Sequence, residues 1–113
     1  MADCLFCNMA QGKMQVDKLY DDDLVFSIRD IHPRAPVHIM VIPKRHVASA
    51  LELRDEHGAL LGRLFAAAAE VAREEGLDER GYRVAFNVGE YAGMTIPHLH
   101  LHIVGGRRLG PEG

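Results

Sequence analysis

Residues 97–106 read Pro97-His98-Leu99-His100-Leu101-His102-Ile103-Val104-Gly105-Gly106, and their alternation is the strongest structural signal in the chain. Successive side chains of a β-strand point to opposite faces of a sheet, so residues two apart share a face. A strand over residues 98–104 would place three imidazoles on one face, while Leu99, Leu101 and Ile103 enter the core on the other. Histidine changes charge near neutral pH, which suits it to catalysis and metal binding. The stretch therefore predicts a strand with one apolar and one chemically active face.

The rest of the chain predicts further strands around one long helix. We expect a hairpin of residues 18–20 and 24–30 around the acidic turn 21–23, and later strands at 37–42 and 82–88. Apolar residues recur at helical spacing from Leu60 to Ala72, with Asp55 as the expected N-cap and Gly76 at the end. A short helical turn is expected at residues 5–9, in an N-terminal region of residues 1–12, and residues 106–113 form a tail. Strands, one helix and more strands with short connections indicate the α+β class with an antiparallel sheet.

Composition narrows the class of protein. The chain has 113 residues, 48% hydrophobic and 26% charged, which fits a single globular domain over residues 1–113. Its net charge of −3 and the absence of tryptophan argue against a nucleic-acid partner. We expect no membrane association, because no apolar run has the length of a membrane span. The first residues lack the basic and apolar parts of a secretory signal, so we expect a cytoplasmic protein.

The polar face of the predicted sheet extends beyond the 97–106 stretch. His38 takes the polar side of the strand at 37–42, and Asn87 takes that of the strand at 82–88. From the residues alone, three interpretations of this face stay open. It is a solvated strand face, a metal site built on three histidines, or a phosphate site in which one imidazole attacks phosphorus while its neighbours hold its tautomer and move protons.

A resemblance to a known family adds to this. The blocks that carry it are Cys4-Leu5-Phe6-Cys7, Asp30-Ile31-His32-Pro33, residues 38–46, Tyr82-Arg83-Val84, Asn87 and residues 97–106. In these blocks and their order, the chain resembles the histidine triad (HIT) family, in the bacterial zinc-binding form of its Hint branch. The resemblance implies the HIT-like fold, which has a five-stranded antiparallel sheet, one long helix and a short N-terminal helix. It also implies a homodimer whose two sheets join into one.

The resemblance implies roles for individual residues. His100 would attack the α-phosphorus of a nucleotide and form a covalent nucleotidyl-histidine, which water then hydrolyses. His102 would protonate the leaving group or hold a phosphate oxygen, and His38 would orient the nucleophile. The implied nucleotide contacts are Asn87 and Thr95 at the phosphate or leaving group, Asp30 at the ribose, and Phe6, Ile28 and Ile31 around the base. Taken alone, Asp30 equally fits a loop-capping aspartate.

The implied activity is cleavage of purine nucleoside 5′-monophosphoramidates or acyl-nucleotides. Two alternatives are hydrolysis of dinucleoside polyphosphates, as in the Fhit-like branch, and a nucleotide-binding scaffold with little turnover. Two departures bear on leaving-group recognition: Met94 stands where the family often has glutamine, and the tail lacks the tryptophan of some Hint proteins. His32 and His57 have no implied role and are expected at the surface.

The cysteines of the N-terminal region need a partner. In a reducing compartment, a Cys-x-x-Cys pair is more often metal-binding or redox-active than a structural disulfide, and buried thiols are a further reading. The resemblance implies one structural zinc per chain, held by Cys4, Cys7, His46 and His98. A solvent-exposed His46 at the end of its strand is the alternative for that residue.

Overall fold

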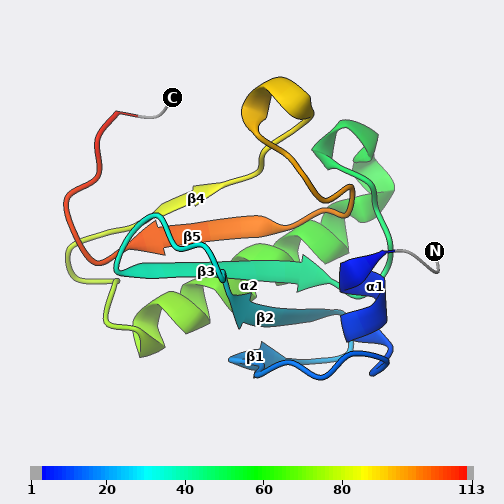
Figure 1. Cartoon of the computed structure of the whole chain (residues 1–113), viewed down its shortest axis with the longest axis horizontal. Helices are drawn as coiled ribbons and strands as arrows, with labels where there is room; N and C mark the ends of the chain where they lie inside the picture. Colours follow the sequence, from blue (N-terminus) through cyan, green and yellow to red (C-terminus); the bar gives the residue numbers. More distant parts are fainter. Residues whose placement is uncertain (1–3, 112–113) are drawn as a thin grey trace.

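Within residues 4–111, which the computed structural model describes, five antiparallel strands form one sheet in the order β1-β2-β3-β5-β4 (Figure 1). The strands are β1 (Tyr20–Asp21), β2 (Val25–Arg29), β3 (Val37–Pro43), β4 (Arg83–Ala85) and β5 (Leu101–Gly105). The helices are α1 (Leu5–Ala10) and α2 (Gly58–Glu74), with 3₁₀ turns at Ala50–Glu52, Asp55–His57 and Glu90–Ala92. The predicted α+β class is confirmed. Residues 1–3 and 112–113, the ends of the predicted N-terminal region and tail, lie outside the described residues.

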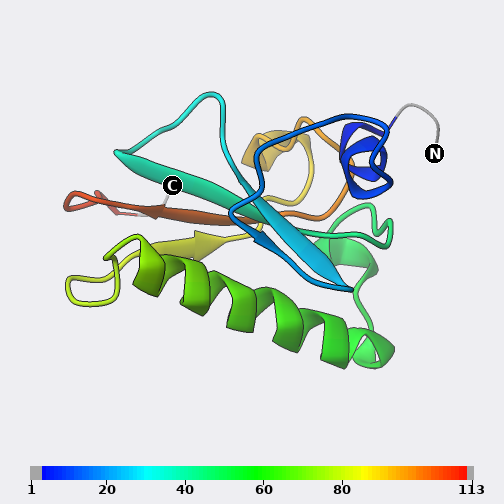
Figure 2. The same ribbon diagram turned by 90° about the horizontal axis from the view of Figure 1, so that it is seen from below.

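The sheet separates two apolar clusters. Helix α2 lies along one face, and α1 lies on the other side of the sheet (Figure 2). The first cluster joins α2 to the sheet and includes Leu64, Val71, Ile39, Leu101 and Ile103, all buried. The second joins α1 to the opposite face and includes Phe6, Phe26, Ile28, Met40 and Ile42. The central strands are thus buried on both faces, and they position the residues described below.

The alternation predicted for residues 98–104 is confirmed for its side chains, although the strand is shorter. Leu99, Leu101 and Ile103 are buried against α2. Strand β5 begins at Leu101 rather than His98, because the Leu99 N–H donates to the Val47 carbonyl at 2.7 Å instead of joining the sheet. The backbone before β5 is therefore held by the loop after β3.

Strand β4 is also shorter than the predicted strand at 82–88, since it covers Arg83–Ala85 alone. Gly89 and Gly93 have φ angles of 81° and 87° and flank the 3₁₀ turn Glu90–Ala92. Positive φ favours glycine and turns the chain away from an extended path. Asn87 consequently lies after the strand and not within it.

The start of the long helix differs from the prediction. Asp55 is not the N-cap of α2, because it opens the separate 3₁₀ turn Asp55–His57. His57 is buried and its Nδ1 accepts the Arg54 N–H at 2.9 Å, so the prediction of a surface His57 is wrong. His32 is exposed, as predicted. The predicted end is confirmed: Gly76 follows α2 with a φ of 75°. In the described part of the chain, no helix has the length and apolar character that crossing a membrane requires.

Candidate active site and metal cluster

Three histidines gather on the sheet face opposite α2. His38 comes from β3, His102 from β5, and His100 from the segment just before β5; all three are buried. In the sheet register, Met40 pairs with His102 and His38 pairs with Val104, so the two histidine side chains share a face on neighbouring strands. His38 Nε2 lies 2.9 Å from His102 Nδ1, and the His100 and His102 ring centres are 4.9 Å apart. The structure thus brings together the three residues predicted to be catalytic.

Backbone and side-chain hydrogen bonds define where the protons of His38 and His102 lie. The Arg34 backbone N–H donates to His38 Nδ1 at 3.1 Å, so that nitrogen carries a lone pair. A neutral His38 therefore carries its proton on Nε2 and donates it to His102 Nδ1. It follows that a neutral His102 carries its own proton on Nε2.

Burial keeps both imidazoles neutral. It lowers the pKa of His38, partly offset by the Asp30 carboxylate. Burial, together with the neighbouring His100 and His38, lowers the pKa of His102 to about 4. At neutral pH without a ligand, the pair therefore holds two neutral rings with defined tautomers.

His100 is oriented by a different contact. Its Nδ1 lies 2.7 Å from the His98 carbonyl oxygen. A carbonyl can only accept, so the Nδ1–H donates and the proton of a neutral His100 is on this nitrogen. Nε2 then carries an available lone pair. The ring is also packed edge-on against Phe6 of α1, with ring centres 5.2 Å apart.

Asp30 makes the loop contact that was weighed for it and also lies beside the histidine pair, while its ribose role stays a prediction. Its Oδ1 accepts the His32 N–H at 2.8 Å, which is the contact of a loop-capping aspartate. Its Oδ2 lies 3.4 Å from His38 Nε2, so the carboxylate also borders the histidine pair. The backbone N–H of Asp30 donates to the His38 carbonyl at 3.0 Å and ties the loop after β2 to β3.

The other predicted nucleotide contacts are distributed unevenly. Phe6 and Ile28 are buried together in the apolar cluster beside the histidines. Ile31 is 86% exposed, on the loop that Asp30 caps. Asn87 is half-buried and Thr95 is exposed. Within residues 4–111, neither forms a hydrogen bond with a histidine of the cluster described above. The nucleotide-binding roles of all five residues stay predictions.

Sequence reasoning missed two groups that organise the site. The Arg34 N–H sets the His38 tautomer, and the Pro43 carbonyl binds His98. Both act through the backbone, which leaves no side-chain signature. The prolines on either side of Arg34 were the one available sign that the backbone there is restricted.

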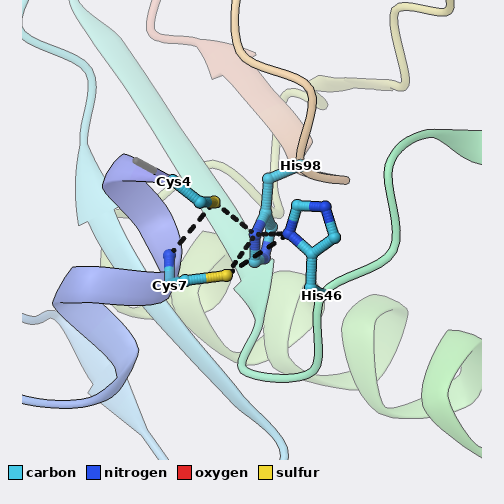
Figure 3. Close-up of side chains that lie close together, drawn as sticks. All are labelled: Cys4, Cys7, His46 and His98. Carbon is cyan, nitrogen blue, oxygen red and sulfur yellow. Dashed lines mark hydrogen bonds between the residues drawn. The ribbon is translucent and has the colours of Figure 1, made fainter. Parts of the chain in front are cut away.

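Cys4, Cys7, His46 and His98 converge into a second cluster from α1, the loop after β3 and the segment before β5 (Figure 3). Cys4 Sγ lies 3.2 Å from His98 Nδ1, and Cys7 Sγ lies 3.3 Å from His46 Nδ1 and 3.5 Å from His98 Nδ1. The two Nδ1 atoms are 3.1 Å apart. The predicted metal ligands are therefore neighbours, and His46 is half-buried rather than exposed at a strand end.

The donor set fits a tetrahedral metal ion. Zinc–nitrogen and zinc–sulfur bonds of ordinary length imply separations of about 3.3 Å between two nitrogens and about 3.6 Å between a nitrogen and a sulfur. The observed separations are slightly shorter than these. His98 Nε2 lies 2.8 Å from the Pro43 carbonyl, so this nitrogen is the donor and Nδ1 directs a lone pair at the sulfurs. A carbonyl that accepts from the other ring nitrogen commonly orients a metal-bound histidine.

The geometry can be compared with known proteins. The sequence profile of the HIT domain matches residues 11–109. The purine nucleoside phosphoramidase of Escherichia coli K12 is 39% identical over 107 residues, which cover 95% of this chain and 90% of that protein. A HIT family hydrolase from Legionella pneumophila superimposes with a TM-score of 0.93 at 40% identity, covering 96% of both chains. A zinc-bound histidine triad family protein from Mycobacterium smegmatis has a TM-score of 0.77 at 34% identity, covering 94% of this chain and 76% of that one. The chain belongs to the HIT family, with its fold, histidine cluster and Cys–His cluster in place.

Proposed function

We propose that this protein is a hydrolase that cleaves purine nucleoside 5′-monophosphoramidates, or acyl-nucleotides, through a covalent nucleotidyl-His100. The observation that carries the proposal is the 2.7 Å contact of His100 Nδ1 with the His98 carbonyl, which leaves Nε2 as the nucleophile. The Escherichia coli purine nucleoside phosphoramidase, 39% identical to this chain, supports this choice of substrate. We place the base beside the apolar cluster that contains the buried Phe6 and Ile28, next to the exposed Ile31, and the Asp30 carboxylate can accept from ribose hydroxyls.

In the first step, His100 Nε2 attacks the α-phosphorus, and the bond from phosphorus to the leaving nitrogen breaks. The anionic phosphate favours one added proton on the His38–His102 pair, with Asp30 beside it. His102 Nε2 gives that proton to the departing amine. The attacking ring becomes an imidazolium whose Nδ1–H stays bonded to the His98 carbonyl.

In the second step, water attacks the same phosphorus and gives a proton to His102 Nε2. The bond between phosphorus and His100 Nε2 breaks, so the nucleoside monophosphate leaves and His100 regains its lone pair. His38 acts here as a positioning residue, because its Nε2–H, 2.9 Å from His102 Nδ1, orients the ring that moves the proton.

The Cys–His cluster is proposed to hold one zinc ion per chain. Cys4, Cys7, His46 and His98 would be its four ligands, and a site with four protein ligands has a structural role. The zinc-bound relative from Mycobacterium smegmatis supports this metal. His98 would link the two sites, since its side chain binds the metal while its carbonyl orients His100.

We also propose a homodimer through the edge of the sheet. Strand β4 pairs with β5 on one side, and in the described residues no strand pairs with its other side. Exposed apolar residues surround this edge, including Val84 on β4 and Phe65 on α2, which is 45% exposed. An unpaired edge with apolar neighbours favours addition of a second copy. Light scattering after size exclusion should give twice the chain mass.

The proposed activity is tested with adenosine 5′-phosphoramidate. Wild-type protein should release AMP, and His100→Ala should release none while still binding AMP and keeping its metal. His32→Ala, an exposed histidine outside the cluster, is the matched control and should retain activity. Binding of AMP without turnover by the wild type would favour a scaffold, and a strong preference for dinucleoside polyphosphates would favour the Fhit-like activity. Loss of the metal in His100→Ala would instead indicate a metalloenzyme.

A further inference from the structure

A hollow of about 1100 Å³ opens at the end of the sheet where β4 begins and β5 ends. Figure 1 shows the chain after β5 turning toward the β4 side of the sheet. Among the described residues that line the hollow, the charged ones are four arginines and one glutamate: Arg80, Arg83, Arg107, Arg108 and Glu75. Glu75 is already engaged, because it accepts from Arg29 at 2.8 Å. A protein of net charge −3 has therefore gathered positive charge in one place.

The arginines fall into two pairs by their contacts. Arg107 donates to the Arg34 carbonyl at 3.0 Å, and Arg83 donates to the Gly110 carbonyl at 2.6 Å, so these two hold the walls together. Arg80 and Arg108 are exposed, and their guanidinium groups make no hydrogen bond or ion pair with any residue from 4 to 111. Guanidinium groups match carboxylate and phosphate oxygens in geometry and charge. The hollow is therefore suited to an anion.

The hollow lies next to the histidine cluster, although His38, His100 and His102 do not line it. Ala85, which lines it, pairs directly with His102, so the two side chains share a face of the sheet. In the strand order, β2 with Asp30 lies on one side of the histidines and β4 lies on the other. If the nucleoside lies near Asp30, the leaving amine, on the other side of the phosphorus, is directed toward β4. Antiparallel pairing of two β4 strands would bring the hollow of the second copy to this side as well.

We propose that the arginine-lined hollow binds an anionic group on the leaving amine of the substrate, and this inference rests on the proposed function. The preferred substrates are then nucleoside phosphoramidates whose amine carries a carboxylate or a phosphate. No new bond is formed in the hollow. The arginines hold the acidic end of the leaving group and thereby align the scissile phosphorus–nitrogen bond with His100.

The test compares substrates that differ in one charge. Adenosine 5′-phosphoramidates of β-alanine and of β-alanine amide have nearly equal size, but the first ends in a carboxylate. The phosphoramidate of O-phosphoethanolamine is a second arm, which separates a phosphate from a carboxylate. The double variant Arg80→Gln/Arg108→Gln removes the two unengaged charges. Lys13→Gln/Arg73→Gln, two exposed positions outside the hollow, removes the same charge and is the matched control.

Wild-type protein should favour at least one acidic substrate over the amide by about tenfold in kcat/KM, the effect expected of one hydrogen bond to a charged group. Arg80→Gln/Arg108→Gln should reduce this preference to less than about threefold and hydrolyse the amide at the wild-type rate; the control should keep the preference. Turnover without any preference, or a preference that survives in the double variant, would overturn the inference alone. No turnover of any of the three would overturn the proposed function and the inference with it.

Discussion

His102 offers a quantitative test of how burial prepares the histidine cluster. Burial lowers its pKa to about 4, whereas a histidine in the unfolded chain has its usual pKa of about 6.5. Between pH 6.5 and pH 4, His102 is protonated in the unfolded chain but stays neutral in the folded protein. The contribution of His102 to the free energy of unfolding is therefore fully present above pH 6.5 and falls as the pH drops from 6.5 to 4. Below pH 4 this contribution changes no further.

The magnitude follows from the two pKa values. Between pH 8 and pH 5, His102 should cost the folded state about 2 kcal/mol, and about 3 kcal/mol once the pH is below 4. His102→Asn removes the titrating group while its side-chain oxygen can still accept from His38 Nε2–H. The variant should therefore lose about 2 kcal/mol less stability than the wild type between pH 8 and pH 5.

Urea unfolding followed by far-UV circular dichroism suits this protein, which has no tryptophan. Each protein is measured at pH 8 and pH 5, and the stability lost by His102→Asn is subtracted from the stability lost by the wild type. Carboxylate titration and acid release of a metal affect both proteins and cancel in this subtraction. His32→Asn controls for the loss of one exposed imidazole. If the wild type and His102→Asn lose the same stability on acidification, the assignment of a buried, neutral His102 is refuted.

Three further predictions concern stability and the metal. Gly106→Ala should lower the free energy of unfolding by about 2 kcal/mol, because φ is 93° and the new Cβ would lie 2.9 Å from Pro36 Cβ. Gly110→Ala, with open space around it, is the control, and an equal effect of the two in denaturant titrations would contradict this reasoning. Ser27→Ala should raise stability by about 1 kcal/mol, because within the described residues the buried Ser27 hydroxyl has no hydrogen-bond partner; a loss in the same titration would show that the hydroxyl is satisfied. Cys7→Ser should reduce bound zinc from one per chain to none by elemental analysis and make Tm insensitive to chelator, whereas full zinc content in the variant would exclude Cys7 as a ligand.

The sequence predicted which side chains share a face better than it predicted where strands end. The alternation of histidine and apolar residues holds for any extended backbone, so the burial of Leu99 and Leu101 follows whether or not the segment joins the sheet. A strand end depends on the neighbouring strand. Because β4 stops at Ala85, the segment before β5 has no partner there and is bonded by Val47 instead. That long-range contact has no signal in local periodicity.

The candidate site divides in the same way. Side chains with distinctive chemistry, such as His38 and His102, were predicted because their residue types and spacing are unusual. His57 was predicted wrongly. Its Nδ1 accepts the Arg54 N–H at the start of the turn Asp55–His57, and the charged residues of this turn gave no sign that the ring is buried. The Arg34 amide and the Pro43 carbonyl act through groups that every sequence position offers. Their importance emerges only when the folded chain places them beside a histidine ring.

The central claim is that His100 Nε2 bonds covalently to the α-phosphorus. The most direct measurement mixes excess protein with adenosine 5′-phosphoramidate, quenches the mixture within one turnover, and locates the label by peptide mass spectrometry under conditions that preserve phosphorus–nitrogen bonds. We predict a transient adenylyl group on the peptide containing residues 98–104, assigned to His100 by fragmentation and absent in His100→Ala. AMP formation at the full rate with no adduct at any time, or an adduct that persists in His100→Ala, would contradict the account.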